Sequence, residues 1–230
     1  MICKKTKCIF IHVPKCAGQS VEAVFLKENG LTWSERHQLL LRVNRDPEKG
    51  PPRLAHLTAR EYVELGYINK ENFSEYFKFG VVRNPYARLV SEYKYRGYFC
   101  SFETFVVKKM PKLTNDHNEG RDYKRHITPQ VDFFKVDGSL AVDQFVKFED
   151  LASGFSDVSK VLNLEVDILP RVNVSGEGGS GLSQMKEWLT RKLFWPKNDS
   201  SYRSFYNDKT KQIVADIYSE DFEVFDYDFE

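Results

Sequence analysis

The sequence predicts an α/β fold in which helices flank a central parallel sheet. Three short apolar runs predict strands, over residues 8–13, 76–82 and 144–148. Each run is followed by a stretch of helical character, over residues 20–26, 85–98 and 150–162. This alternation is typical of a parallel sheet whose strands are joined by crossover helices.

Capping residues indicate where several helices begin. Thr58 and Glu61 have the spacing of a capping box, and Asn207 is a suitable cap for the last helix. Ser20 is a suitable cap for the helix that follows the first strand. The remaining helices are predicted over residues 33–43, 58–65, 101–110 and 207–218. Polar residues 44–53 and 112–123 are predicted to be loops, and the glycine-rich residues 173–181 are expected to form a flexible connector or a lid over a bound cofactor.

The overall composition is that of an ordinary globular protein. The chain has 230 residues, of which 41% are hydrophobic, and its formal net charge is +1. This length suits a single domain over residues 1–230. A charge so close to zero excludes a general basic surface for nucleic acid, so any anion site has to be local.

No segment has the character of a targeting or membrane sequence. Residues 1–7 are rich in lysine, and the apolar run after them is too short for a signal peptide. No run approaches the roughly 20 apolar residues of a membrane span. The four cysteines are not arranged as CxxC pairs, and no cluster has metal-ligand spacing. A soluble, cytoplasmic protein without a metal is therefore expected, and its oligomeric state stays open.

The turn after the first strand has the character of a phosphate-binding loop. Ala17 and Gly18 allow the backbone to approach a ligand closely, Lys15 adds a positive charge, and Ser20 adds a hydroxyl group. The N–H groups at the start of the next helix favour an anion. These features indicate a P-loop-like scaffold, although the lysine precedes the glycine, unlike in the Walker pattern. The alternative interpretation is an ordinary turn with a surface lysine.

A second candidate anion site follows the strand predicted at residues 76–82. Arg83 stands at the end of that strand, where ligands bind in open parallel sheets and where arginine can hold a phosphate. Asn84, Arg88 and Ser91 share one stripe of the following helix. The alternatives are a small packing residue for Ser91 and a solvated charge for Arg88. Two such sites at two strand ends suggest a ligand with two separate phosphate groups.

Together, "HVPKCAGQS" and "VVRNPYARLVSEY" resemble the two cofactor-binding motifs of the sulfotransferase superfamily, most closely its carbohydrate branch with the heparan and dermatan 2-O-sulfotransferases. The resemblance implies the cofactor 3′-phosphoadenosine 5′-phosphosulfate (PAPS), whose product is adenosine 3′,5′-bisphosphate. It also implies that Arg83 and Ser91 bind the 3′-phosphate. The residues implied to hold the phosphosulfate are Pro14, Lys15, Cys16, Ala17, Gly18, Gln19 and Ser20.

The resemblance extends less specifically along the rest of the chain. Residues 126–134, 146–151 and 218–227 are similar to later segments of the same branch. One clear difference is Gln19, which stands where the family loops commonly carry threonine. Gln19 lacks that hydroxyl group, although its backbone N–H remains.

His56 and Glu22 are the two candidates for the base that removes the proton of an acceptor hydroxyl. His56 precedes the helix capped by Thr58, which favours a neutral imidazole. By resemblance, a catalytic histidine lies between the two cofactor motifs. Glu22 matches a glutamate that some sugar sulfotransferases use, or it complements the helix dipole. The transition state needs a cation at the leaving oxygen, a role that suits Lys15.

Two other histidines have possible supporting roles, because His12 is expected to pack or to orient the loop and His126 to support the site. A hydroxyl-bearing acceptor, most simply a glycan, is expected. Three segments combine basic and aromatic residues that could grip an anionic glycan or could be ordinary surface: residues 94–99, 121–125 and 186–192. The alternatives are a sulfotransferase for a non-carbohydrate small molecule, a P-loop small-molecule kinase, and an inactive nucleotide- or glycan-binding module.

Overall fold

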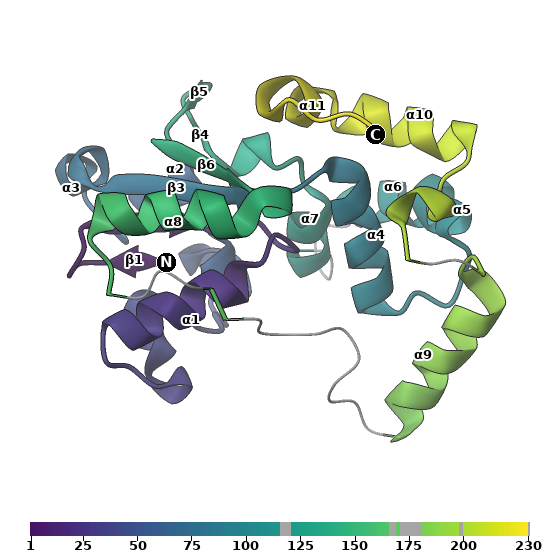
Figure 1. Cartoon of the computed structure of the whole chain (residues 1–230), viewed down its shortest axis with the longest axis horizontal. Helices are drawn as coiled ribbons and strands as arrows, with labels where there is room; N and C mark the ends of the chain where they lie inside the picture. The colour runs from purple at the N-terminus through teal and green to yellow at the C-terminus, as the bar shows by residue number, and fades with distance from the viewer. Residues whose placement is uncertain (116–120, 166–168, 171–180, 198–199, 230) are drawn as a thin grey trace. The chain divides into compact units, whose positions relative to one another are not determined.

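The computed structural model describes the chain except residues 116–120, 166–168, 171–180, 198–199 and 230. It divides into two compact units (Figure 1). The first unit comprises residues 1–83 and 130–172, and the second comprises residues 84–129 and 173–230. The expectation of one domain over residues 1–230 stays a prediction.

The first unit contains a four-stranded sheet with the strand order β1-β2-β3-β6 (Figure 1). The strands are β1 (Ile2–Cys3), β2 (Cys8–Ile11), β3 (Phe77–Val82) and β6 (Gln144–Lys147). Strand β3 pairs in parallel with both β2 and β6, whereas β1 pairs antiparallel to β2. The predicted α/β fold with a central, mostly parallel sheet is therefore confirmed.

Two helices cover one face of this sheet. Phe25 of α1 (Gly18–Glu28) lies against Phe79 of β3, with ring centroids 5.9 Å apart. Helix α8 (Leu151–Leu162) approaches β6 so closely that a Cβ atom at Gly154 would lie 2.8 Å from Val146. Val146 pairs with Val81, which shares the face of Phe79 because side chains alternate along a strand.

Phe134 covers the opposite face of the sheet. A Cβ atom at Gly80 would lie 2.3 Å from the ring of Phe134, so only glycine leaves room for this ring. The Phe134 ring also meets Phe145 of β6 edge to face, at a centroid distance of 4.9 Å. Both faces are covered, and the two inner strands β2 and β3 are accordingly buried along almost their whole length, as parallel strands commonly are.

Short elements complete the first unit. They are η1 (Trp33–Leu39), η2 (Pro47–Lys49), η3 (Leu54–His56), α2 (Ala59–Glu64), α3 (Lys70–Glu75), η5 (Val131–Phe133), β4 (Lys135–Val136), β5 (Ser139–Leu140) and η6 (Phe148–Asp150). The capping box predicted at Thr58 and Glu61 is present. The helix predicted over residues 33–43 is instead a 3-10 helix that ends at Leu39, because Leu40 adopts the left-handed conformation.

Helix α1 begins earlier than the sequence predicts. Its N-cap is Ala17, and Ser20 lies within its first turn, so the assignment of Ser20 as the N-cap is wrong. The physical reason is the backbone of Ala17, whose φ of 55° breaks the helical path directly before Gly18. The start of α1 therefore lies within the small-residue part of the loop.

The second unit is helical in its described part. Its elements are α4 (Pro85–Arg96), α5 (Phe102–Thr104), the π-helical η4 (Phe105–Lys109), α6 (Met110–Asn115), α7 (Arg121–Ile127), α9 (Gly181–Phe194), η7 (Tyr202–Phe205), α10 (Asp208–Ile217) and α11 (Ser219–Phe225). The predicted apolar side of α4, which includes Tyr86 and Tyr93, packs into an aromatic core with Phe102, Phe105 and Tyr218. The predicted cap at Asn207 is also confirmed.

The loop predicted over residues 112–123 is partly wrong. Helix α6 continues to Asn115, and α7 begins at Arg121. Met110 starts α6 from within the buried core, and this packing extends the helix into a polar sequence. The glycine-rich residues 173–181, which are expected to form a flexible connector or a lid, lie almost entirely outside the described residues.

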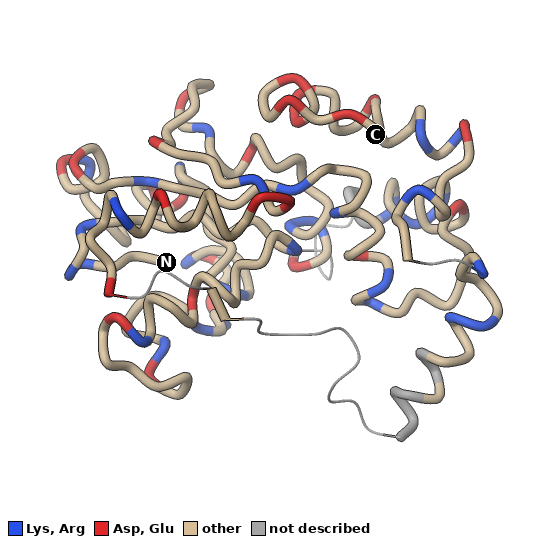
Figure 2. Tube along the Cα trace, viewed as in Figure 1, with Lys and Arg blue, Asp and Glu red and all other residues tan. Residues whose placement is uncertain are grey.

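Charge is distributed without a dominant sign along both units (Figure 2), as the net charge of +1 implies. Among the residues that the structure describes, no helix combines the length and the apolar character needed to cross a membrane.

Candidate functional site

The loop between β2 and α1 has an unusual backbone. Lys15 and Ala17 both adopt the left-handed conformation, with φ of 71° and 55°. This conformation costs a non-glycine residue roughly 1–2 kcal/mol. Strain of this kind is stored mainly at ligand-binding sites, where the surrounding structure maintains it. Alternating backbone conformations also turn successive N–H groups toward one point, as in anion-binding nests. The loop therefore has the geometry of an anion cradle.

The N-terminus of α1 adds to this cradle. The helix has 11 residues, its N-cap Ala17 makes no side-chain cap hydrogen bond, and its first turn contains no acidic residue. The positive end of the helix dipole is thus not neutralised from within the helix. Ser20 lies in the first turn, and Lys15 is only half-buried in the loop before it.

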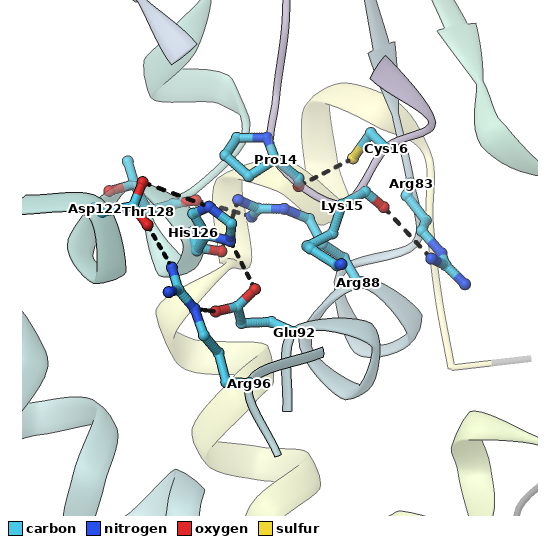
Figure 3. A network of polar contacts seen from close by, with 10 residues as sticks. All are labelled: Pro14, Lys15, Cys16, Arg83, Arg88, Glu92, Arg96, Asp122, His126 and Thr128. Atoms are coloured by element: carbon cyan, nitrogen blue, oxygen red, sulfur yellow. Dashed lines mark hydrogen bonds and ion pairs between the residues drawn. The ribbon is translucent and has the colours of Figure 1, made fainter. Parts of the chain in front are cut away.

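Arg83 lies beside this loop. It follows β3 directly, and its Nη1 donates a hydrogen bond to the carbonyl oxygen of Lys15 at 3.4 Å (Figure 3). Its guanidinium group also lies over the ring of Phe148, 4.2 Å from the ring centroid. Parallel strands β2 and β3 end at the same edge of the sheet, and this places the side chain of Arg83 against the backbone of the loop at Lys15.

Gln130 connects the loop to the end of β3. Its Oε1 accepts hydrogen bonds from the backbone N–H of Arg83 at 2.9 Å and from the Cys16 thiol at 3.3 Å. Its Nε2 donates to the carbonyl oxygen of Arg83 at 2.7 Å. Gln130 is fully buried. No role was predicted for Gln130 from the sequence, although Gln130 lies in the segment "HITPQVDFF". The hydrogen bond to Gln130 makes Cys16 a buried structural residue of the loop.

Ser91 lies on α4 in the second unit, where it is half-buried. Its expected partnership with Arg83 stays a prediction. Arg88 is not the solvated charge that one interpretation expects, because it is 2% exposed. Its guanidinium donates to the carbonyl oxygens of Thr128 and His126, at 2.8 and 3.0 Å.

His126 belongs to a buried ionic network in the second unit (Figure 3). Its Nδ1 lies 2.7 Å from Oε2 of Glu92, and Arg96 bridges Glu92 and Asp122 at 2.9 and 2.7 Å. Burial lowers the pKa of His126, although the Glu92 carboxylate acts in the opposite direction. This network joins α4 to α7 within the second unit. The expected support of the site by His126 stays a prediction.

His12, Glu22 and His56 come together in the first unit. His56 ends η3 and is 6% exposed, and its ring meets the His12 ring edge to face at a centroid distance of 4.9 Å. Nδ1 of His12 lies 2.7 Å from Oε1 of Glu22. Both candidate bases thus lie near the start of α1, with His12 in contact with each. The choice between His56 and Glu22 stays a prediction.

Comparison with known proteins identifies the family. A model of the Sulfotransferase family matches residues 1–228. The chain belongs to this family. This sulfotransferase is 32% identical over 94 residues to carbohydrate sulfotransferase 10 of Gallus gallus and, equally, to that of Homo sapiens.

The resemblance to the carbohydrate branch of the superfamily is thereby supported. The matched segment covers 40% of this chain and 24% of either relative, so the sulfotransferase aligns with about a quarter of the length of those proteins. No solved structure matches the chain. Family membership makes the protein a transferase.

Proposed function

We propose that this sulfotransferase transfers a sulfuryl group from PAPS to a hydroxyl group of a carbohydrate. The observation that carries the proposal is the strained loop between β2 and α1, where Lys15 lies beside Arg83 at the ends of two parallel strands. A donor with two separate phosphate groups needs two anion sites. The cradle of the loop and the guanidinium group of Arg83 supply chemistry suited to both.

The residues of the loop fit the phosphosulfate end of PAPS. Backbone N–H groups of residues 14–20, the ammonium group of Lys15 and the hydroxyl group of Ser20 would hold it. Arg83 and Ser91 would hold the 3′-phosphate. When bound, PAPS would supply the activated sulfuryl group.

The roles proposed for side chains follow from the charges that develop during transfer. Lys15 places a positive charge at the leaving oxygen and so stabilises the transition state. His56 accepts the proton of the acceptor hydroxyl group. Its position two residues before Thr58, the N-cap of α2, together with its burial, favours the neutral imidazole that a base requires. Glu22 is less suited to this role because its carboxylate is engaged with His12.

A carbohydrate acceptor is supported by the names of the relatives, both of which are carbohydrate sulfotransferases. It is also supported by two aromatic side chains of the segment at residues 94–99. Tyr95 and Phe99 are 54% and 52% exposed, and such rings can stack on sugar rings. A non-carbohydrate small molecule with a hydroxyl group is the alternative acceptor.

The proposal is tested by binding and transfer measured separately. Calorimetric titration with adenosine 3′,5′-bisphosphate is expected to show binding that Lys15→Ala and Arg83→Ala weaken. Incubation with radiolabelled PAPS and a glycan panel is expected to label a glycan. Absence of bisphosphate binding would refute the proposal, and stabilisation of the protein by Mg²⁺ and ATP would favour a kinase. If only non-carbohydrate small molecules with hydroxyl groups were labelled, the acceptor would be a small molecule rather than a carbohydrate.

A further inference from the structure

Two buried ionisable groups in the first unit have no part in the proposed transfer. His12 directly follows β2, and Glu22 lies in the second turn of α1. Nδ1 of His12 is 2.7 Å from Oε1 of Glu22, and the side chains are 8% and 5% exposed. A buried pair with such geometry is costly to assemble, since both groups lose their hydration.

The carboxylate of Glu22 fixes the orientation of the His12 ring. With Glu22 as a carboxylate, which only accepts hydrogen bonds, Nδ1 of His12 donates this bond. Phe10 stacks on the same ring at a centroid distance of 5.6 Å, with an interplanar angle of 19°. The imidazole is therefore held by a hydrogen bond at one edge and by an aromatic ring on one face.

The opposite edge of the His12 ring supports the start of α1. A Cβ atom at Gly18 would lie 1.9 Å from Nε2 of His12, far inside van der Waals contact. The first residue of the helix is thus packed directly on the imidazole. Because Gly18 also ends the strained loop, any shift of the ring moves the backbone that would hold the phosphosulfate.

The same ring contacts the proposed base. The rings of His12 and His56 meet edge to face, with centroids 4.9 Å apart and an interplanar angle of 86°. One imidazole therefore touches both the cofactor loop and the side chain that would accept the proton. A displacement of the His12 ring would therefore affect both the loop at Gly18 and the position of the His56 ring.

We propose that Glu22 and His12 are positioning residues, which together set the place of the loop at Gly18 and of the His56 ring. The inference rests on the proposed function, in which the loop at Gly18 binds the cofactor and His56 accepts the proton. It assigns Glu22 a role through His12, rather than the role of a base acting on the acceptor.

The test compares Glu22→Met, whose thioether is only a weak hydrogen-bond acceptor, with Glu22→Gln, whose amide oxygen is a good one. Glu28→Met is the matched control, because Glu28 is a second buried glutamate of α1 that pairs with Lys5 at 3.0 Å. The readouts are bisphosphate affinity, the ring resonances of His56 in ¹H–¹³C spectra, and thermal unfolding. The first two report on the site, while unfolding reports on stability alone.

Glu22→Met is expected to weaken bisphosphate binding about tenfold and to move the His56 resonances, with Glu22→Gln regaining most of both. Glu28→Met is expected to lower the stability of the protein but to leave bisphosphate affinity and the His56 resonances unchanged. The inference is overturned if Glu22→Met matches Glu28→Met in affinity and in the His56 spectrum. If Glu22→Met does not fold, His12→Asn decides, because it keeps an amide that can donate to Glu22 but removes the ring that contacts Gly18 and His56. Unchanged bisphosphate affinity and unchanged His56 resonances in His12→Asn would then overturn the inference. Failure of the unmodified protein to bind bisphosphate would instead refute the proposed function.

Discussion

Gln130 holds Arg83 by both ends of its side-chain amide. The N–H of Arg83 donates to Oε1 of Gln130 at 2.9 Å, and Nε2 of Gln130 donates to the carbonyl oxygen of Arg83 at 2.7 Å. The same Oε1 also accepts from the Cys16 thiol of the neighbouring loop. A single buried amide thus fixes the relative place of the two strand ends to which cofactor binding is assigned.

Replacement of Gln130 by leucine is expected to weaken both folding and bisphosphate binding. It removes the side-chain partner of two backbone groups of Arg83, and each buried polar group left without a partner costs about 1–3 kcal/mol. We therefore expect the free energy of unfolding to fall by about 2–6 kcal/mol. Denaturant unfolding and calorimetry measure the two effects. Gln212→Leu, at an exposed position of α10, serves as the control and should change neither.

Gly18→Ala is expected to distort the start of α1. The new methyl group would overlap the ring of His12, and overpacking of this kind typically costs about 1–3 kcal/mol. Bisphosphate affinity should fall together with the free energy of unfolding, because the distortion falls on the cofactor loop.

The double variant His12→Ala/Gly18→Ala provides the control for this overlap. With the imidazole gone, the methyl group has room, so adding Gly18→Ala to His12→Ala should cost much less than adding it to the unmodified protein. Equal costs in the two backgrounds would show that the His12 ring is not what excludes a side chain at position 18.

Much of the fold could be predicted from local sequence. The apolar run of β3 and the proline after Asn84 predicted a strand followed by a helix, and the structure has β3 and α4 there. Strand β1 was not predicted, because two residues carry no periodicity. The start of α1 was misplaced because the side chain of Ser20 suggests a cap, whereas the backbone angle of Ala17 decides it.

The contacts within the site were less predictable, because they join residues far apart in the chain. Lys15 and Arg83 could be associated through the rule that parallel strands end at one edge of a sheet. No such rule places Gln130 against Cys16, which is 114 positions away. The pairing of His12 with Glu22 depends on the exact position and rotation of α1 on the sheet. The sequence pattern predicts that α1 packs on the sheet but not this position or rotation.

Ala17→Gly is expected to stabilise the protein. Ala17 has a φ of 55°, a conformation that glycine adopts without the penalty of roughly 1 kcal/mol that alanine bears. The matched control is Ala23→Gly within α1, where glycine should destabilise by about 1 kcal/mol. Thermal unfolding of both variants checks the prediction. Destabilisation by both substitutions would mean that the loop is not strained at Ala17.

Acidification is expected to destabilise the protein partly through His126. Burial lowers the pKa of His126 from its ordinary value of 6.5, while the nearby charges of Glu92, Asp122 and Arg96 modify this shift. The unfolded chain then binds a proton more readily than the folded one, so stability is complete above pH 6.5 and is lost as the pH falls below it.

Urea unfolding at pH 7.5 and pH 5.5 measures this contribution. His126→Asn removes the titrating ring but leaves an amide that can donate to Glu92. We expect the loss of stability between the two pH values to be smaller in this variant than in the unmodified protein. An equal loss would assign the pH dependence to other groups.

His56→Ala is expected to abolish most turnover while bisphosphate binding persists. General base catalysis contributes typically about 10²–10⁴-fold, so a loss of that size in the transfer rate would place His56 at the reacting hydroxyl group. His37→Ala, at an exposed position of η1, is the control and should retain full activity. The rates are measured with radiolabelled PAPS and the acceptor found in the glycan panel. Unchanged turnover in His56→Ala would remove His56 as the base, and Glu22→Gln would then be compared in the same assay.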